Sequence, residues 1–508
     1  MPPVAKEDSS PDIFDKRRLP AALDEFLRRL NPWWVGKPGP VLPPYRRWAF
    51  GKILRTMRSG LAPVTVVRGP RQVGKSTLQE QVIDHLIGEE GVEPTRILRV
   101  QFDDLRPLGS IELPVQTIAW WFEDRVLLRT FNESAREGKP AFLLLDEVQN
   151  LSGWAEQIKS LVDHSTVKVL VTGSSALRIE AGRDSLAGRI STIELGPLLL
   201  REVAGVALGE ELPALLPDNG LEPLKRRETW QALQRHGVEN RDGRDRAFSA
   251  WAVRGGYPLA HKNPDASWYE VADQLVETVV RRAIQHDLRM GERGQKRDER
   301  LLEEVFRLVC RYTGQSPRQA VFIDDIKSAL DANIGWQRIQ AYQRFLEGAM
   351  LLRLIPPLEL RLKKKRGPAK ICVCDHGLRA AWLQEVVPLD PDELQRQPAM
   401  ADLAGHIAES AAGYFLSGIS HLDVAHFPER GPEPEVDFVL TIGEQRIPVE
   451  IKYRRRIDQH ADTRGLRAFV ERTVYNAPFG VLVTMLDDVT IDDPRVVVVS
   501  LRSLLTLR

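Results

Sequence analysis

Two short stretches of this chain carry side chains whose types and spacing could do chemistry. GPRQVGKST, residues 69–77, fits the pattern G-x-x-x-x-G-K-[ST] without a mismatch. This pattern is typical of a loop that binds nucleotide phosphates. IPVEIKYRRR, residues 447–456, places Glu450 and Lys452 one residue apart, ahead of three arginines. The second stretch is either an ordinary half-buried strand with a surface ion pair or half of a metal-dependent nuclease site.

The chemistry of phosphate binding explains the spacing in the first stretch. Gly69 and Gly74 let the backbone curl so that its N–H groups face the phosphates. Lys75 reaches the β- and γ-phosphates, Ser76 is a ligand of Mg²⁺, and the following helix points its positive end at the anion. The alternative is a chance glycine-rich turn. We predict that ATP is bound by Gly69, Pro70, Arg71, Gln72, Val73, Gly74, Lys75, Ser76 and Thr77.

A second group of residues supports the nucleotide site. AFLLLDEVQN ends a fully apolar strand in Asp146 and Glu147. Asp146 would hold Mg²⁺ through water, and Glu147 would polarise the attacking water; the alternative is capping of a nearby helix. Ser174 ends a further strand and is placed to sense the γ-phosphate. Arg189, in DSLAGRI, is either an arginine finger toward a neighbouring subunit's nucleotide or a solvated surface charge.

The IPVEIK stretch needs partners to become a metal site. Residues i and i+2 of a strand point to the same face, so Glu450 and Lys452 project together while Val449 and Ile451 face the core. Upstream, EVDFVL carries Asp437, and the turn IGEQR predicts a hairpin that brings Asp437 close to this pair.

Carboxylates and a lysine at one strand edge are what metal-assisted phosphodiester cleavage needs. Asp437 and Glu450 would bind Mg²⁺, or Mn²⁺ in its place, together with the Ile451 carbonyl, and Glu409 from the preceding helix would complete the shell. Lys452 would position water and offset developing charge. Arg454, Arg455 and Arg456 would line the approach of DNA or would simply be exposed.

A basic segment between two strands offers a second contact with nucleic acid. Apolar spacing predicts helices at 301–312, 322–330 and 336–346, followed by strands at 350–355 and 371–374. This order predicts a winged helix. Its wing would touch phosphates, unless it meets protein or is only solvated. The wing residues are Arg361, Lys363, Lys364, Lys365 and Arg366.

Composition sets the broad class. The chain has 508 residues, 43% hydrophobic and 28% charged, which predicts a soluble globular protein of about three domains. A net charge of +1 creates no global field for nucleic acid, so such affinity must be local. Three cysteines are too few for a disulfide framework, and the chain shows neither a signal peptide nor a membrane span. We predict a cytoplasmic protein.

Several motifs together resemble a prokaryotic branch of the AAA+ ATPases. They are GPRQVGKST, LLLDEVQN, VTGSSA, AGRI…ELGPLLLREV and GGYP. The resemblance covers nearly the whole chain from NPWW onward, apart from an insertion between Arg201 and Ala250 that is polar and is expected to be irregular. It implies a winged helix and then a C-terminal domain of restriction-endonuclease type. The order of Glu409, Asp437, Glu450 and Lys452 looks like a PD-(D/E)xK nuclease core, although Val436 stands where that core has proline.

The predicted fold class is α/β, with a P-loop parallel-sheet ATPase core, a helical lid, a winged helix and a restriction-endonuclease-like α/β domain. The expected segments are an N-terminal helical part (1–60), the ATPase core (61–195), the lid (196–294), the winged helix (295–390) and the nuclease-like domain (400–508).

The predicted function is ATP-driven action on DNA, with RNA not excluded, by a homo-oligomer that cleaves or handles the strand. One alternative is a nucleotide-switched DNA-binding or regulatory protein with a silent nuclease fold, since inactive relatives of this fold are common. Another is an ATPase that remodels protein partners.

Overall fold

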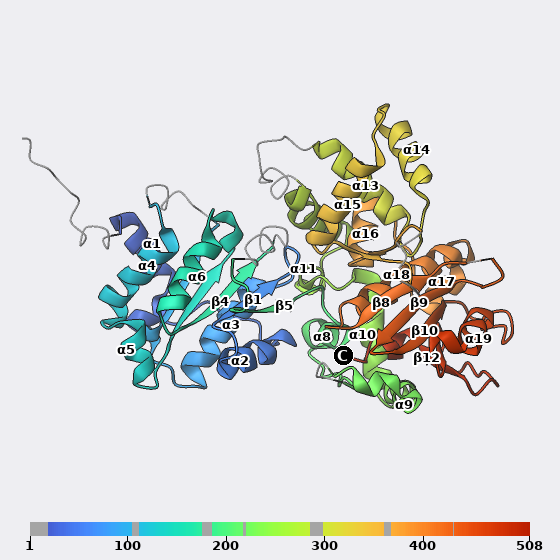
Figure 1. Ribbon diagram of the computed structural model, residues 1–508, viewed down its shortest axis with the longest axis horizontal. Helices are drawn as coiled ribbons and strands as arrows, with labels where there is room; N and C mark the ends of the chain where they lie inside the picture. Colours follow the sequence, from blue (N-terminus) through green and yellow to red (C-terminus); the bar gives the residue numbers. More distant parts are fainter. Residues whose placement is uncertain are drawn as a thin grey trace, which may run out of the picture. The chain divides into compact units, whose positions relative to one another are not determined.

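The computed structural model describes residues 19–103, 111–174, 185–216, 220–284, 298–359, 367–429 and 431–508. Over these ranges the chain forms two compact units, divided in the sequence at Leu195 and Gly196 except that Pro70–Val73 are grouped with the second unit (Figure 1). No helix in the described ranges is long and apolar enough to cross a bilayer.

The first unit is built on a parallel sheet with the strand order β2-β3-β4-β1-β5. Most of its residues are buried, as expected for a parallel sheet covered on both faces. Its strands are β1 (Val64–Arg68), β2 (Ile97–Gln101), β3 (Ala141–Asp146), β4 (Val167–Gly173) and β5 (Ile190–Glu194). The parallel sheet confirms the predicted α/β fold of this part of the chain.

Helices cover the sheet of the first unit (Figure 1). They are α1 (Ala21–Leu30), η2 (Pro32–Val35), α2 (Ala49–Ser59), α3 (Lys75–Gly88), η3 (Pro94–Arg96), α4 (Pro114–Phe122), η5 (Glu123–Leu127), α5 (Phe131–Arg136), η6 (Val148–Asn150) and α6 (Trp154–His164). The register aligns Arg68 with Gly173 and Leu145 with Val171, so β1, β3 and β4 end at one edge. In open α/β sheets, ligands bind outside this carboxyl edge.

The second unit begins with helices and short turns. They are α8 (Leu200–Val203), η7 (Ala204–Leu208), η8 (Glu222–Lys225), α9 (Arg227–Glu239), α10 (Arg241–Arg254), α11 (Pro258–His261), α12 (Trp268–Leu275) and η9 (Val276–Arg281). The prediction of an irregular insertion between Arg201 and Ala250 is therefore wrong, because this stretch contains α9 and most of α10, whose buried faces carry residues such as Trp230 and Phe248.

Three helices and a two-stranded antiparallel sheet follow. They are α13 (Glu299–Arg311), α14 (Gln319–Leu330), α15 (Trp336–Gly348), β6 (Leu352–Ile355) and β7 (Lys370–Val373), and α16 (His376–Leu383) comes after them. This is the order of elements that the sequence predicts for a winged helix.

The last part of the chain is an α/β domain whose five strands run in the order β12-β11-β10-β9-β8. Strands β8, β9 and β10 pair antiparallel, whereas β10, β11 and β12 pair parallel. Its elements are α17 (Pro391–Arg396), η11 (Pro398–Met400), α18 (Ala401–Ser417), β8 (Asp423–Phe427), β9 (Val436–Ile442), β10 (Gln445–Lys452), α19 (Arg464–Glu471), η12 (Thr473–Tyr475), β11 (Gly480–Thr484), β12 (Val496–Ser500) and α20 (Leu501–Leu504).

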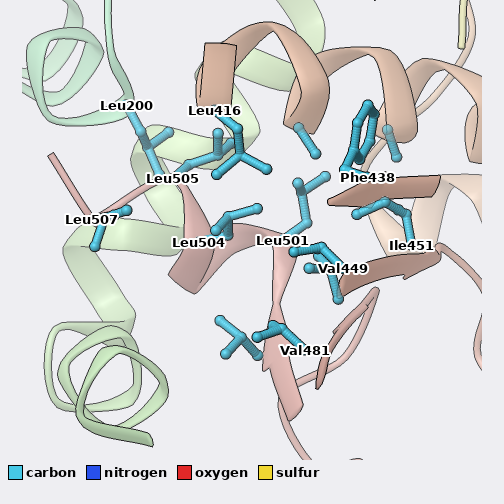
Figure 2. Packing of buried hydrophobic residues seen from close by; sticks show 14 of the residues in the cluster. Leu200, Leu416, Phe438, Val449, Ile451, Val481, Leu501, Leu504, Leu505 and Leu507 are labelled. Carbon is cyan, nitrogen blue, oxygen red and sulfur yellow. The ribbon is translucent and has the colours of Figure 1, made fainter. Parts of the chain in front are cut away.

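One hydrophobic core joins this sheet to the helices at the start of the second unit. Figure 2 shows Leu200 of α8 and Leu416 of α18 among side chains from the sheet and the C-terminal leucines. Val449 and Ile451 belong to this core, as the strand alternation predicts. Their burial directs the neighbouring residues Glu450 and Lys452 to the opposite face of β10.

Candidate nucleotide site and acidic cluster

The turn between β1 and α3 has the backbone of a phosphate-binding loop. Gly74 has φ +89°, a conformation that favours glycine, and α3 begins at the next residue, Lys75. The Lys75 side chain is buried, and its Nζ donates a hydrogen bond to the Gly69 carbonyl at 3.0 Å. The lysine ammonium is therefore held over the loop, at the N-terminal end of a helix whose dipole attracts anions.

Asp146 ends β3 and is fully buried. The Thr172 hydroxyl donates a hydrogen bond to its Oδ1 atom. The other oxygen, Oδ2, accepts no hydrogen bond from the described residues and lies 3.9 Å from Nη2 of Arg99. A buried carboxylate oxygen without a donor is unfavourable unless a cation approaches it. Asp146 thus fits the predicted role of holding Mg²⁺.

Glu147, the next residue, has φ +53° and lies at the turn after β3. Its Oε2 atom accepts a hydrogen bond from the Ser174 hydroxyl at 3.0 Å and another from the Gln149 side-chain amide. The Gln149 amide also lies 3.1 Å from the Ser174 Oγ. The structure thus brings Glu147 and Ser174 into direct contact at the ends of β3 and β4, with Gln149 bonded to both.

Arg189 lies just before β5 and forms a two-pronged ion pair with Asp163 of α6. Its Nη2 atom is 3.1 Å from Asp163 Oδ2, and its Nε atom donates to Oδ1. A hydrogen bond from Arg189 lowers the pKa of Asp163. Within the first unit the guanidinium therefore has a partner, and its role as a finger stays a prediction.

Asp437, Glu450 and Lys452 meet on adjacent strands of the second unit. Lys452 Nζ lies 2.6 Å from Glu450 Oε1, and the Ile451 N–H donates to Asp437 Oδ2 at 2.8 Å. The Asp437 N–H is 3.4 Å from Glu450 Oε2. The structure therefore brings together the three residues that the β9–β10 hairpin was predicted to gather.

A lysine that the sequence did not single out completes this acidic cluster, which we define as Glu409, Asp437 and Glu450. Lys370, the first residue of β7, is 2% exposed. Its Nζ donates to Glu409 Oε1 and to Asp437 Oδ1, the latter at 3.0 Å. Glu435 lies 3.5 Å from the same ammonium. Lys370 of β7 thus bridges Glu409 of α18 and Asp437 of β9.

Burial and neighbouring charges shift the pKa values of the three carboxyl groups in the acidic cluster in different directions. Burial and the nearby Asp437 carboxylate raise the pKa of Glu409 to about 7 and that of Glu450 to about 8. Burial alone would raise the pKa of Asp437, but the Lys370 ammonium, a hydrogen bond with Glu409, the Lys452 ammonium and the Ile451 N–H together outweigh it and lower this pKa to about 2. Burial alone would lower the pKa of Lys370, yet Asp437, Glu409 and Glu435 raise it well above its usual value. Asp437 and Lys370 are therefore the firmly charged pair.

The acidic cluster does not fit a divalent ion as predicted. Among the described residues, no group of three or more His, Cys, Asp or Glu side chains is arranged to hold a metal ion. Both oxygens of Asp437 accept hydrogen bonds, from Lys370 and from the Ile451 N–H. Lys452 binds Glu450 directly. The chain itself thus supplies hydrogen-bond donors to both oxygens of Asp437, whereas one oxygen of Asp146 has no hydrogen-bond donor among the described residues.

The predicted nucleic-acid contacts divide into two groups. Arg361, Lys363, Lys364, Lys365 and Arg366 lie outside the described residues. Of the three arginines after β10, Arg454 pairs with Asp462 and Arg455 lies 2.7 Å from Asp392, while Arg456 is exposed. Two of these three charges are thus partly neutralised by acidic neighbours, and their role as DNA contacts stays a prediction.

Sequence reasoning missed Arg99, Gln149, Thr172 and Lys370. Gln149 and Thr172 lie within three residues of predicted site residues, so closeness to the strand ends could have suggested them. Arg99 lies inside the apolar strand β2, and a charge buried there needs a partner, so its position could have indicated a nearby acidic residue. Lys370 had no such signal, since it stands between a basic run and the apolar stretch ICVC.

Comparison with known protein families agrees with the geometry of the first unit. Residues 62–204 match the model of the AAA domain family. This stretch is therefore similar to AAA domains, and we call it the AAA domain below. Residues 245–387 match a domain of unknown function, DUF8612, which includes β7 and Lys370. The AAA match covers β1, the phosphate-binding loop, Asp146 and Glu147.

Proteins with sequence similarity come from archaea and bacteria. Uncharacterized protein MJ1637 of Methanocaldococcus jannaschii is 29% identical over 151 residues, or 30% of this chain and 29% of its own length. Uncharacterized protein Rv2008c of Mycobacterium tuberculosis is 23% identical over 377 residues, or 72% of this chain and 66% of its own length. The chain thus spans less than two thirds of the length of these relatives.

Among solved structures, the Walker-type ATPase PABY2304 of Pyrococcus abyssi aligns with a TM-score of 0.36 at 14% identity, covering 67% of this chain and 99% of that one. The Orc1 protein of Aeropyrum pernix, solved in complex with DNA, aligns with a TM-score of 0.26 at 13% identity, covering 67% of this chain and 94% of that one.

Proposed function

We propose that this chain hydrolyses ATP with its AAA domain and acts on DNA through its second unit. The observation that carries the first half is Asp146, a fully buried carboxylate whose Oδ2 lacks a hydrogen bond at the edge where the phosphate-binding loop begins. Such an oxygen favours a bound cation, and the cation that accompanies ATP in P-loop proteins is Mg²⁺.

Different residues of the AAA domain would bind the phosphates, hold Mg²⁺ and orient the attacking water. The backbone of residues 69–77 and the Lys75 ammonium would hold the phosphates, and Ser76 and Asp146 would hold Mg²⁺. When bound, Mg²⁺ neutralises negative charge on the phosphates. Glu147 would orient the attacking water at its Oε2 atom, which now accepts hydrogen bonds from Ser174 and Gln149.

The second half of the proposal rests on the helices α13–α15, the β6–β7 pair and the basic run at 361–366. Neutral substitution of Lys363, Lys364 and Lys365 should weaken duplex binding evenly across sequences. Each lost phosphate contact should reduce the log–log salt slope by about 0.9. Fluorescence anisotropy over a range of salt concentrations measures this slope.

A matched control separates wing contacts from net charge. Substitution of the exposed residues Lys37, Lys139 and Lys262 changes the charge equally but should leave the slope unchanged. Equal slopes for the wild type and the Lys363/Lys364/Lys365 variant would contradict DNA binding by the wing, and would favour a protein partner there.

The role of the C-terminal domain has two candidates. The meeting of Asp437, Glu450 and Lys452 favours a Mg²⁺- or Mn²⁺-dependent nuclease. The ion pairs of Lys370 with Glu409 and Asp437 argue against a metal site and thus against cutting, so we prefer the second candidate, a domain that handles nucleic acid without cleaving it. Labelled single- and double-stranded DNA and RNA, incubated with ATP and either metal, decide between them. Cleavage lost on adding EDTA and in Asp437→Ala would establish the nuclease.

Homo-oligomerisation remains part of the proposal because an arginine finger acts on a neighbouring subunit's nucleotide. Sedimentation of the purified chain with and without ATP measures the mass. A monomer at all concentrations with ATP would contradict a shared site.

A further inference from the structure

We propose that the Lys370 ammonium is the resident cation of the acidic cluster, standing where a nuclease of this fold would need a divalent metal. The inference does not depend on the proposed action on DNA, and it concerns the second unit alone. It assigns a role to a buried lysine that neither family match explains.

The position of the ammonium carries the argument. Lys370 Nζ bridges Glu409 of α18 and Asp437 of β9, and lies 3.5 Å from Glu435. These two bridged residues come from the same elements that were predicted to supply metal ligands. A metal bound to their facing oxygens at about 2.1 Å would lie against the ammonium, and the two positive charges would repel each other.

The lysine is placed by tight packing between β7 and α18. The Val373 N–H of β7 donates to the Ser410 Oγ of α18 at 2.9 Å. A Cβ atom at Gly413 would lie 2.5 Å from the Cys372 Sγ, so only glycine allows the helix to approach β7 this closely. Cys372 is itself fully buried in the shared core. The backbone from which Lys370 projects is therefore held close against α18.

The free energy of burying charges explains why Lys370 and the carboxylates around it depend on one another. A fully buried ammonium without acidic partners would be strongly unfavourable, and so would the clustered carboxylates without a cation. Each charge compensates the other. The arrangement fastens the two-stranded sheet β6–β7 to the C-terminal domain and leaves the acidic cluster with its positive charge already supplied.

The test measures Mn²⁺ binding to nucleotide-free, metal-free protein by electron paramagnetic resonance, together with the melting temperature Tm. We expect the wild type and Asp437→Asn to bind the same amount of Mn²⁺, and the metal to shift the Tm of both by the same amount. Lys370→Met should lower the metal-free Tm by about 10 °C, as expected when a buried pair is broken. Mn²⁺ should raise the Tm of this variant by more than it raises that of the wild type, and the additional rise should disappear in Lys370→Met/Asp437→Asn.

Controls keep the result interpretable. Lys452→Met removes a half-buried ammonium from the same cluster and should not create an Asp437-dependent Mn²⁺ site, because Lys370 is still present. If Lys370→Met does not fold, Lys370→Gln, which retains hydrogen-bond donors, replaces it, and the wild-type comparison with Asp437→Asn needs no change at Lys370. Mn²⁺ uptake by the wild type that is lost in Asp437→Asn would overturn the proposal. Absence of Mn²⁺ binding in a folded Lys370 variant would overturn it equally.

Discussion

The two acidic sites of this chain differ in where their compensating charge comes from. In the AAA domain, Asp146 is fully buried and its Oδ2 accepts no hydrogen bond from the described residues. In the acidic cluster, Asp437 is nearly as buried, yet Lys370 and the Ile451 N–H engage both of its oxygens. At the first site one carboxylate oxygen is left without a hydrogen bond, with the Arg99 guanidinium 3.9 Å away, whereas at the second site both oxygens of Asp437 already accept hydrogen bonds. Acidic residues in the right order therefore do not by themselves make a metal site.

Glu147→Gln should produce the largest functional change. Loss of the group that orients water should lower ATP turnover by about 10³-fold, while nucleotide binding persists because the phosphate-binding loop is intact. Lys75→Ala should instead weaken binding. Phosphate release and binding of a fluorescent ATP analogue measure the two effects separately. Undiminished turnover in Glu147→Gln would show that another residue handles the water.

Arg189→Ala tests whether the AAA domain is complete within one chain. A finger contributes about 10³-fold or more to turnover with little effect on affinity. Asp163→Asn is the matched control, because it removes the ion-pair partner of Arg189 and keeps the arginine. Restored turnover on mixing Arg189→Ala with Lys75→Ala would establish action between subunits. Equal ATP turnover in Arg189→Ala and the wild type would show that Arg189 only forms an ion pair with Asp163 and takes no part in hydrolysis.

Asp437→Ala and Asp146→Asn should have opposite effects on the stability of the nucleotide-free protein. Asp437→Ala leaves the buried Lys370 with one partner fewer and should destabilise by about 3–5 kcal/mol. Asp146→Asn removes an incompletely paired buried charge and should stabilise. Urea unfolding, followed separately for each unit by hydrogen exchange, measures both. Destabilisation by Asp146→Asn as large as that by Asp437→Ala would remove the contrast between the sites.

The buried pair of Arg244 and Asp487 gives a smaller, pH-dependent reference for Lys370. Arg244 is fully buried and its Nη2 atom lies 2.6 Å from Asp487 Oδ2. Burial alone would raise the pKa of Asp487, but hydrogen bonds from Arg244 and Ser500 outweigh it and lower this pKa. A lowered pKa stabilises the fold above the unfolded value of about 3.9, and the stabilisation is lost as pH falls below it.

Asp487→Asn should therefore destabilise at pH 7 by about 1–3 kcal/mol, and its difference from the wild type should shrink below about pH 4. Thermal unfolding across this pH range measures the difference. A difference that is constant from pH 7 to pH 3 would show that hydrogen bonding rather than charge holds the pair.

The sequence was sufficient where the signal was local. Loop 69–77 predicts its own turn and helix, and the spacing of Glu450 and Lys452 predicts their shared face of β10. Lys370 could not be found in this way, because its partners Glu409 and Asp437 are 39 and 67 residues away. Arg244 likewise meets Asp487 across 243 residues from within a polar stretch. In both cases only tertiary packing distinguishes a buried cation from a solvated one.

Anomalous X-ray diffraction from crystals grown with Mn²⁺ and a non-hydrolysable ATP analogue tests the contrast between the two sites most directly. Both sites then meet the same metal in the same molecule. We predict a manganese peak beside Ser76 and Asp146, and none within the acidic cluster of Glu409, Asp437 and Glu450. A manganese peak between Asp437 and Glu450 in the wild-type chain, with Lys370 displaced, would contradict the account.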